Sequence, residues 1–170
     1  MTGLTPRLAL FTLLSLPLTV TALEPGERAP AWELSTPAGQ VVRYPGDAAG
    51  HASVVLFWAT WCPYCRSLMP HIQVLAEEFR ERPVRFYALN VWEDGDPVAY
   101  MTRQGFSFTL LLNADPVAPA WGVPGTPGLF VLDPDGRVVY RRGSGATDDE
   151  VEADMRGILD ALLAQRASSP

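Results

Sequence analysis

A short apolar run and the two cysteines that follow it limit the folds open to this chain more than any other feature. Residues 54–58 (Val-Val-Leu-Phe-Trp) are strand formers and too few for a helix, so they predict a strand buried on both faces, as in a parallel sheet. From residue 62 to residue 80, apolar side chains recur at steps of three and four, which predicts a helix. Cys62 and Cys65, the only cysteines in the chain, therefore fall where a buried strand ends and a helix begins.

The spacing of the two cysteines suits redox chemistry. Three residues apart at the start of a helix, both sulfurs lie in the first turn, within reach of a disulfide. Unpaired backbone N–H groups and the positive end of the helix dipole favour a thiolate there. We expect Cys62 to be the more exposed sulfur and the nucleophile. We expect Cys65, on the apolar face of the helix, to resolve the mixed disulfide that Cys62 forms.

Three other interpretations of the pair are weaker. A structural disulfide would close only a tiny loop and remove little chain entropy. A peroxidase needs its cysteine in a Thr-x-x-Cys setting beside an arginine, whereas Trp61 precedes Cys62 and Arg66 is the only arginine close by. Two sulfurs are too few for most metal sites, although a two-thiolate site remains open because Cu(I) accepts soft ligands at low coordination number. We therefore predict a redox pair that works with no bound metal and no cofactor.

The first 22 residues are typical of an export signal. Arg7 gives a positive start, residues 8–20 are mostly apolar, and Val20-Thr21-Ala22 resembles a cleavage site, which we expect to be cut after Ala22. As a helix the apolar run would rise about 20 Å, less than the ~30 Å hydrocarbon core of a bilayer. An uncleaved anchor is the alternative. The sequence thus predicts a protein of the periplasm or cell envelope that touches the membrane only through this segment.

Composition narrows the partners and the number of domains. A length of 170 residues suits one domain, which we place at residues 31–166 after a lead-in linker at 23–30. With 48% hydrophobic and 19% charged residues, the chain is not a disordered acidic tail. Its net charge of −6, with no dense block of arginines, disfavours nucleic acid as a partner. We expect a monomer.

The remaining pattern predicts an α/β fold. Strands alternate with helices, which implies right-handed crossovers and a mostly parallel sheet, with an antiparallel hairpin at one edge and helices on both faces. The predicted elements are a first hairpin (32–34 and 41–43), strands at 84–90 and 108–112, a helix at 97–104, a second hairpin (129–132 and 137–140) and a closing helix at 151–163.

Two segments carry a resemblance to a known family. Residues 57–65 (Phe-Trp-Ala-Thr-Trp-Cys-Pro-Tyr-Cys), with Pro70 after them, resemble the active site of the thioredoxin superfamily. Residues 122–127 (Gly-Val-Pro-Gly-Thr-Pro) look like its cis-proline loop, with the cis bond between Thr126 and Pro127. The resemblance implies a central mixed β-sheet flanked by helices, an N-terminal β-hairpin and a central β/α insert.

The same resemblance implies a substrate-binding surface around the cysteines. Its residues would be Trp61, Pro63, Tyr64, Thr126 and Pro127. A proline without an N–H leaves the Thr126 backbone free to pair with an extended substrate segment. Trp61 would form a hydrophobic rim, whereas we interpret the other four tryptophans first as packing residues. These are Trp32, Trp58, Trp92 and Trp121.

The insert at residues 90–121, the hairpin and the export signal together resemble the extracytoplasmic TlpA/ResA-like thioredoxins. Members of that group reduce disulfides in exported proteins, including apocytochromes c and copper-site proteins, and are recharged by a membrane thiol-disulfide carrier. Glu93 matches an active-site glutamate of the group. This implies an acid/base that manages the Cys65 proton, its pKa tuned upward by partial desolvation. The alternative is a solvated acid beside Asp94 and Asp96.

The sequence therefore predicts an exported thiol-disulfide oxidoreductase that reduces protein disulfides. A disulfide-forming oxidase and a Cu(I)-delivery module with the same cysteines remain alternatives, because the potentials of CxxC proteins span roughly 150 mV. With no third cysteine, the chain cannot pass electrons to a second pair of its own. We expect its partners to be disulfide-containing or dithiol client proteins and the membrane carrier. Gly128 follows the proline where many relatives carry Thr or Glu, which weakens the case for apocytochromes as specific clients.

Overall fold

The fold is known from a computed structural model that describes residues 23–168. The predicted export segment, residues 1–22, lies outside the described residues. Five strands form the central sheet in the order β5-β4-β3-β6-β7. They are β3 (Ala52–Trp58), β4 (Val84–Asn90), β5 (Thr109–Leu111), β6 (Gly128–Leu132) and β7 (Val138–Arg141). β3, β4 and β5 run parallel and β6 and β7 are antiparallel to their neighbours, so the predicted mixed sheet with a hairpin at one edge is confirmed.

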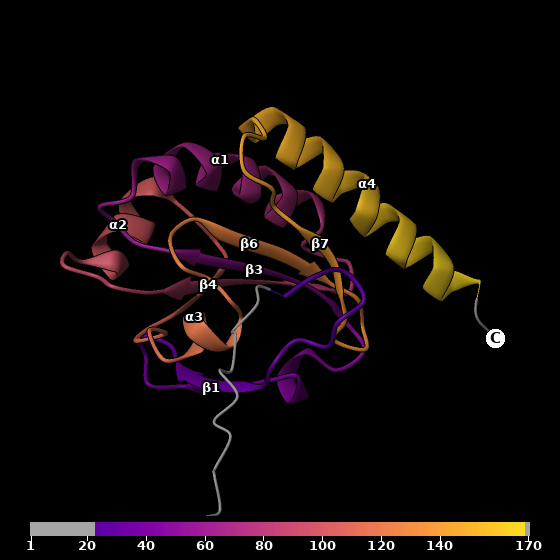
Figure 1. The fold of residues 1–170 in the computed structure, drawn as a ribbon, viewed down its shortest axis with the longest axis horizontal. Coiled ribbons are helices and arrows are strands. Elements are labelled where there is room, and N and C mark those ends of the chain that lie inside the picture. The colour runs from indigo at the N-terminus through magenta and orange to yellow at the C-terminus, as the bar shows by residue number, and fades with distance from the viewer. Residues whose placement is uncertain (1–22, 169–170) are drawn as a thin grey trace, which may run out of the picture.

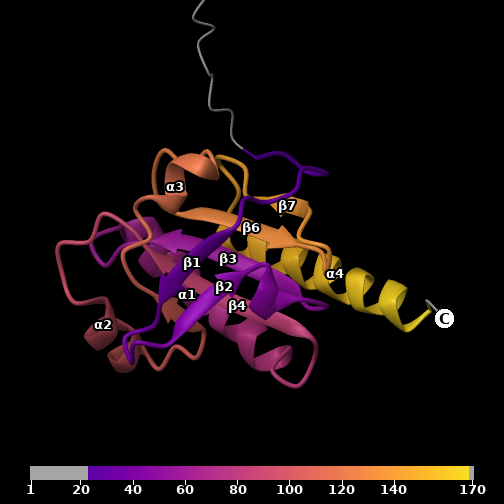
Figure 2. The same ribbon diagram turned by 90° about the horizontal axis from the view of Figure 1, so that it is seen from below.

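Different elements cover the two faces of the sheet (Figures 1 and 2). On one face lie three helices, namely α1 (Pro63–Glu78), α2 (Pro97–Gln104) and α4 (Asp148–Ala167). On the other lie a separate antiparallel hairpin and two short helical segments, namely β1 (Trp32–Ser35), β2 (Val41–Tyr44), the 3-10 turn η1 (Gly46–Ala48) and α3 (Val117–Ala120). Helices therefore lie on both faces of the sheet, as expected, but on the second face the helical segments are short and the N-terminal hairpin provides much of the cover.

Alternation along β3 explains why the sheet has two hydrophobic cores. Val54 and Leu56 face the helices and pack with residues of α1, α2 and α4. Val55 and Phe57 point the other way and pack with the hairpin, α3 and Trp121. Because every residue of β3 is buried, most of the strand, residues 54–58, is one continuous apolar run in the sequence. This strand carries the chain directly to the cysteines.

The segment predicted as a lead-in linker is not free. The Gly26 N–H donates to the Val138 carbonyl, and the Val138 N–H donates to the Glu27 carbonyl, both at 2.8 Å. Arg28 makes an antiparallel bridge with Arg137, and Ala29 is buried. Residues 23–30 therefore lie along the outer edge of β7 as part of the folded domain. No helix within residues 23–168 is long and apolar enough to cross a membrane.

Candidate active site

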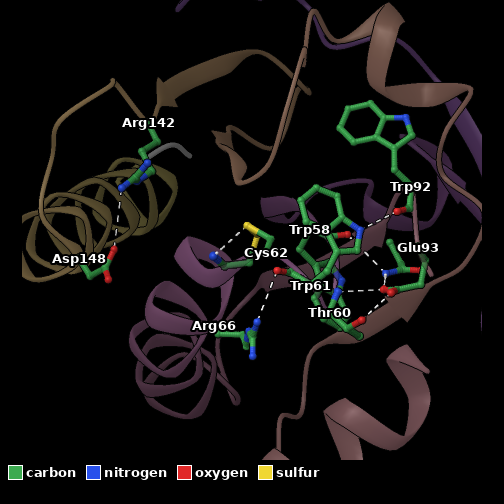
Figure 3. The surroundings of a disulfide bond; sticks show 11 residues. Trp58, Thr60, Trp61, Cys62, Arg66, Trp92, Glu93, Arg142 and Asp148 are labelled. Carbon is green, nitrogen blue, oxygen red and sulfur yellow. Dashed lines mark hydrogen bonds and ion pairs between the residues drawn. A yellow bond between two sulfur atoms is a disulfide. The ribbon is translucent and has the colours of Figure 1, made fainter. Parts of the chain in front are cut away.

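The start of α1 holds the two cysteines in a disulfide. Cys62 is the N-cap of the helix, in an extended conformation, and Pro63 begins the first turn, where its missing N–H leaves no bond unmade. The two Cα atoms are 5.3 Å apart. The Cys65 N–H donates to the Cys62 sulfur at 3.1 Å, so this sulfur occupies the position of a capping oxygen (Figure 3). The helix N-terminus thus directs an N–H at the predicted nucleophile.

The two cysteines have the predicted order of exposure. Cys62 is 2% exposed and Cys65 is fully buried, so the difference between them is small. Both belong to the core cluster on the helix-covered face of the sheet, together with Leu68 and Met69 of α1. A partner must therefore approach closely to reach the Cys62 sulfur.

A groove opens beside the disulfide. It encloses about 850 Å³ between the start of α1, the loop at residues 122–127 and the connection between β7 and α4. Tyr64, Thr126 and Pro127 line it, which brings together three of the five predicted substrate-binding residues. The Thr126–Pro127 bond is cis, as predicted. Trp61 and Pro63 are exposed but do not line the groove.

The far wall of the groove was not predicted. Arg142 donates to the Ala146 carbonyl at 3.0 Å and lies 3.9 Å from the Asp148 carboxylate. Asp148 also accepts a hydrogen bond from Ser67 of α1. The Nε of Arg142 and the hydroxyl of Thr126 are buried without a hydrogen-bond partner among the described residues. The groove therefore offers polar groups to a bound segment on both of its sides.

Gly128 has a structural explanation. A Cβ at this position would lie 2.8 Å from a methyl group of Val123 and 3.5 Å from the Cβ of Phe57. Neither neighbour can retreat easily, because both are buried in the core on the hairpin side. The Thr or Glu that related proteins place after the proline would not fit here.

Glu93 accepts five hydrogen bonds where β3 and β4 end. Its two oxygens accept from the Thr60 N–H at 2.9 Å, the Thr60 hydroxyl at 2.5 Å and the Asn90 amide at 2.6 Å. The N–H groups of Asp94 and Gly95 add bonds of 3.1 and 2.9 Å. A Cβ on Gly95 would come within 2.6 Å of the Thr60 hydroxyl, so the loop closes around the carboxylate only with glycine there. None of the five donors is a cysteine.

This setting corrects the expected tuning of Glu93. Burial acts to raise the pKa of Glu93, but hydrogen bonds from the Thr60 and Asn90 side chains and from the Thr60 and Gly95 amides hold it below the 4.5 of an unperturbed glutamate. This direction is opposite to the upward tuning that the resemblance implies, because these hydrogen bonds stabilise the charged form. The geometry makes Glu93 a carboxylate that ties Thr60, two residues before Cys62, to the end of β4.

Replacing Glu93 by Gln will destabilise the protein in a pH-dependent way. At neutral pH the glutamine NH2 group would replace one accepting oxygen and face the N–H and O–H donors around Glu93. We therefore expect a loss of about 2 kcal/mol of unfolding free energy. The pKa of Glu93 is lower in the folded state than in the unfolded state. Its contribution is thus complete above the unfolded pKa and disappears as the pH falls through the folded value. Urea unfolding should show the difference between the two proteins shrinking from about pH 5 to about pH 3.

Asp94→Asn is the matched control for this substitution. Asp94 is an exposed neighbour whose carboxylate takes part in no hydrogen bond or ion pair within the described chain. Equal stability of the two variants at neutral pH would contradict the role of the Glu93 carboxylate. The predicted proton transfer with Cys65 is checked separately, since an unchanged rate–pH profile in Glu93→Gln would argue against it.

The surroundings of Trp61 set it apart from the packed tryptophans. Trp61 is 44% exposed, and its indole N–H donates to the Trp92 carbonyl at 2.7 Å (Figure 3). Trp32, Trp58 and Trp121 are buried, which confirms their predicted packing role, but Trp92 is 37% exposed, so its prediction as a packing residue is wrong.

Arg66 donates to the Trp61 carbonyl at 3.4 Å and to no sulfur, unlike the arginine that a peroxidase needs beside its thiolate.

Sequence reasoning missed the partners that fix Glu93. The local sequence around Thr60 and Asn90 does not mark either residue as a partner of Glu93. A buried asparagine at the end of an apolar strand was the available signal, because a buried polar side chain needs a partner.

No group of three or more His, Cys, Asp or Glu side chains within residues 23–168 is arranged to hold a metal.

Relatives with curated names share the cysteine chemistry. The chain is 29% identical over 140 residues to the thiol-disulfide oxidoreductase ResA of Geobacillus thermodenitrificans, an alignment covering 81% of this chain and 80% of that one. It is 36% identical over 110 residues to the thiol:disulfide interchange protein DsbE of Allochromatium vinosum, covering 62% and 58%. A crystal structure from Chlorobium tepidum, assigned as a DsbE, superposes with a TM-score of 0.72 at 27% identity, covering 83% of this chain and 99% of the other.

The family model agrees with the fold and with the cysteine pair. The AhpC/TSA family model matches residues 25–141, from the docked N-terminal segment through β7. That span includes the disulfide, Glu93 and the cis-proline loop. The chain is a thiol-disulfide oxidoreductase with a thioredoxin-like fold, and it belongs to the AhpC/TSA family.

Proposed function

We propose that this oxidoreductase works outside the cytoplasm and reduces disulfides in exported proteins. The observation that carries the proposal is the disulfide at the start of α1, with a cis-proline loop and an open groove beside it. Export is supported by the signal-like residues 1–22 and by the relatives named ResA and DsbE. Apocytochromes c and copper-site proteins are the client classes that the resemblance favours.

The reduction proceeds in two exchanges between sulfur atoms. In the reduced protein the Cys62 thiolate attacks one sulfur of a client disulfide, forming a mixed disulfide and releasing the first client thiolate. The Cys65 thiolate then attacks the Cys62 sulfur, which closes the Cys62–Cys65 disulfide and releases the second client thiolate. Two electrons pass to the client, whose thiolates take up two protons. The product is the disulfide that the structure shows.

The groove is suited to an extended client segment. Thr126 has no backbone hydrogen-bond partner among residues 23–168, since β6 begins pairing with β3 only at Gly128. A client strand laid beside Thr126 would therefore gain main-chain hydrogen bonds without displacing any. Its neighbouring residues would extend into the groove past Tyr64 toward Arg142.

Each turnover leaves the protein oxidised, so it needs a reductant. The chain has no further cysteine to supply the electrons. A membrane thiol-disulfide carrier with its own dithiol would restore Cys62 and Cys65 by the reverse exchange, becoming oxidised itself. The Cys62 sulfur would then receive both partners at the same surface.

The reduction potential of the Cys62–Cys65 pair tests the proposed direction. We expect about −230 mV or lower, toward thioredoxin at about −270 mV, when the mature domain is equilibrated in glutathione buffers. A value near −120 mV, typical of a strong oxidant, would contradict the proposal and favour disulfide formation. Alkylating the free thiols and measuring the mass of the protein by mass spectrometry gives the reduced fraction in each glutathione buffer.

A further inference from the structure

Two exposed aromatic side chains lie at the start of α1, and a third is hydrogen-bonded to one of them. Six large apolar side chains within the described chain are exposed, and they are Val41, Val74, Val98, Trp61, Tyr64 and Trp92. Trp61 and Tyr64 flank Cys62 in sequence. Trp92 joins them because its carbonyl accepts the Trp61 indole N–H at 2.7 Å. We call these three aromatic residues the aromatic rim.

The backbone of Trp92 is held in a conformation that does not suit tryptophan. Its φ of +49° lies in the left-handed region, which is unfavourable for a residue with a Cβ. The conformation is fixed by main-chain contacts on both sides. The Trp92 N–H donates to the Asp115 carboxylate at 3.0 Å, and its carbonyl accepts from Trp61. Glycine or asparagine would meet the same contacts with less strain.

The indole of Trp92 lies outside both hydrophobic cores. It pairs with no other ring in the part of the chain that the structure describes. The three buried tryptophans are at most 6% exposed, against 37% for Trp92. A large side chain that is exposed, has an unfavourable backbone conformation and is hydrogen-bonded to the residue before a reactive cysteine is typical of a functional site.

We propose that Trp92, with Trp61 and Tyr64, binds apolar residues flanking the reacting cysteine of a client protein. This inference rests on the proposed function, because a mixed disulfide at Cys62 brings the client against Trp61 and Tyr64. Figure 3 shows Trp61 between Cys62 and Trp92, with Arg142 and Asp148 of the groove on the opposite side of the disulfide. A client segment is therefore held on both sides of its cysteine. Rigid aromatic side chains offer large contact areas at low entropic cost.

Trp92→Gly separates this role from a structural one. The substitution removes the indole and suits the φ of +49°, so we expect no drop in melting temperature. The substrates are two disulfide-linked peptides that differ only in having Leu or Ser on each side of the cysteine, and bis(2-hydroxyethyl) disulfide, which has no flanking residues. We expect the natural protein to reduce the Leu peptide about tenfold faster than the Ser peptide, a difference of about 1.4 kcal/mol.

In Trp92→Gly this preference should fall to about twofold or less, with an unchanged rate on the small disulfide. Trp92→Phe, which keeps an aromatic ring, should retain the preference for the Leu peptide. Val74→Ala, twelve residues along the chain from Cys62, should also leave this preference unchanged. The inference is overturned if Trp92→Gly keeps the preference, or if it slows all three substrates equally. It also fails if the natural protein reduces both peptides at one rate, a result that leaves the proposed function standing. No reduction of any disulfide would overturn both.

Discussion

Replacing Cys62 by Ser will lower the rate of disulfide reduction by about a thousandfold or more, because a serine hydroxyl is not ionised at neutral pH and cannot replace a thiolate nucleophile. The assay follows reduction of a fluorogenic disulfide peptide with dithiothreitol as the electron source. Val74→Ala on the exposed side of α1 is the control.

Cys65→Ser should behave differently from Cys62→Ser. The first exchange still takes place, but no thiolate remains to attack the Cys62 sulfur, so mixed disulfides with clients accumulate. Non-reducing electrophoresis followed by mass spectrometry should find these adducts in Cys65→Ser and not in Cys62→Ser. Adducts only in Cys62→Ser would reverse the two roles. The trapped clients would also show whether cytochromes c or copper-site proteins are among them.

Replacing Trp121 by Ala will produce the largest loss of stability, about 4 kcal/mol of unfolding free energy. Trp121 is fully buried, and its ring lies 5.5 Å from Phe57 and 5.3 Å from Phe130, measured between ring centroids. Its indole N–H also donates to the Pro30 carbonyl at 3.2 Å. Removing the side chain leaves a cavity between the sheet and the N-terminal hairpin, and Pro30 without its partner.

Trp121→Phe is the matched comparison, since it keeps an aromatic ring and loses the hydrogen bond. We expect it to lose about half as much stability as the alanine variant, measured by urea unfolding of the oxidised protein. A loss below about 1 kcal/mol in Trp121→Ala would mean that the core on the hairpin side collapses around the cavity. Trp121 directly precedes the cis-proline loop, so the alanine variant should also bind client peptides more weakly at temperatures where it remains folded.

Local patterns predicted most of the elements. β4 and α2 have the predicted bounds. The strand predicted at 54–58 begins two residues earlier, at Ala52. These segments have a strong apolar period or clear capping signals, such as Asp96 before α2. α3 (Val117–Ala120) was missed, because one turn that contains a proline shows no period. The N-terminal hairpin was predicted, but its position over the second face of the sheet was not, because its four-residue strands do not reveal what they cover.

In the candidate site, too, the residues within local motifs could be predicted, whereas the contacts between distant segments could not. The cysteines and the cis-proline lie in contiguous motifs, so the sequence alone could place them. The contacts of Glu93 depend on Thr60, 33 residues earlier, which meets it only because β3 and β4 are parallel neighbours. The prediction for Trp92 was wrong because tryptophan is usually buried, and no local sequence pattern shows that this side chain is 37% exposed.

The N-terminal segment at residues 23–30 covers the outer edge of β7, which would otherwise be open to another chain. β7 is the last strand of the sheet, and its outward hydrogen-bonding groups at Val138 are taken by Gly26 and Glu27. An uncovered strand edge is a template on which another chain can add a strand. Cleavage at the predicted position after Ala22 would keep this cover, whereas a cut only eight residues later would remove it and leave a protein prone to aggregate.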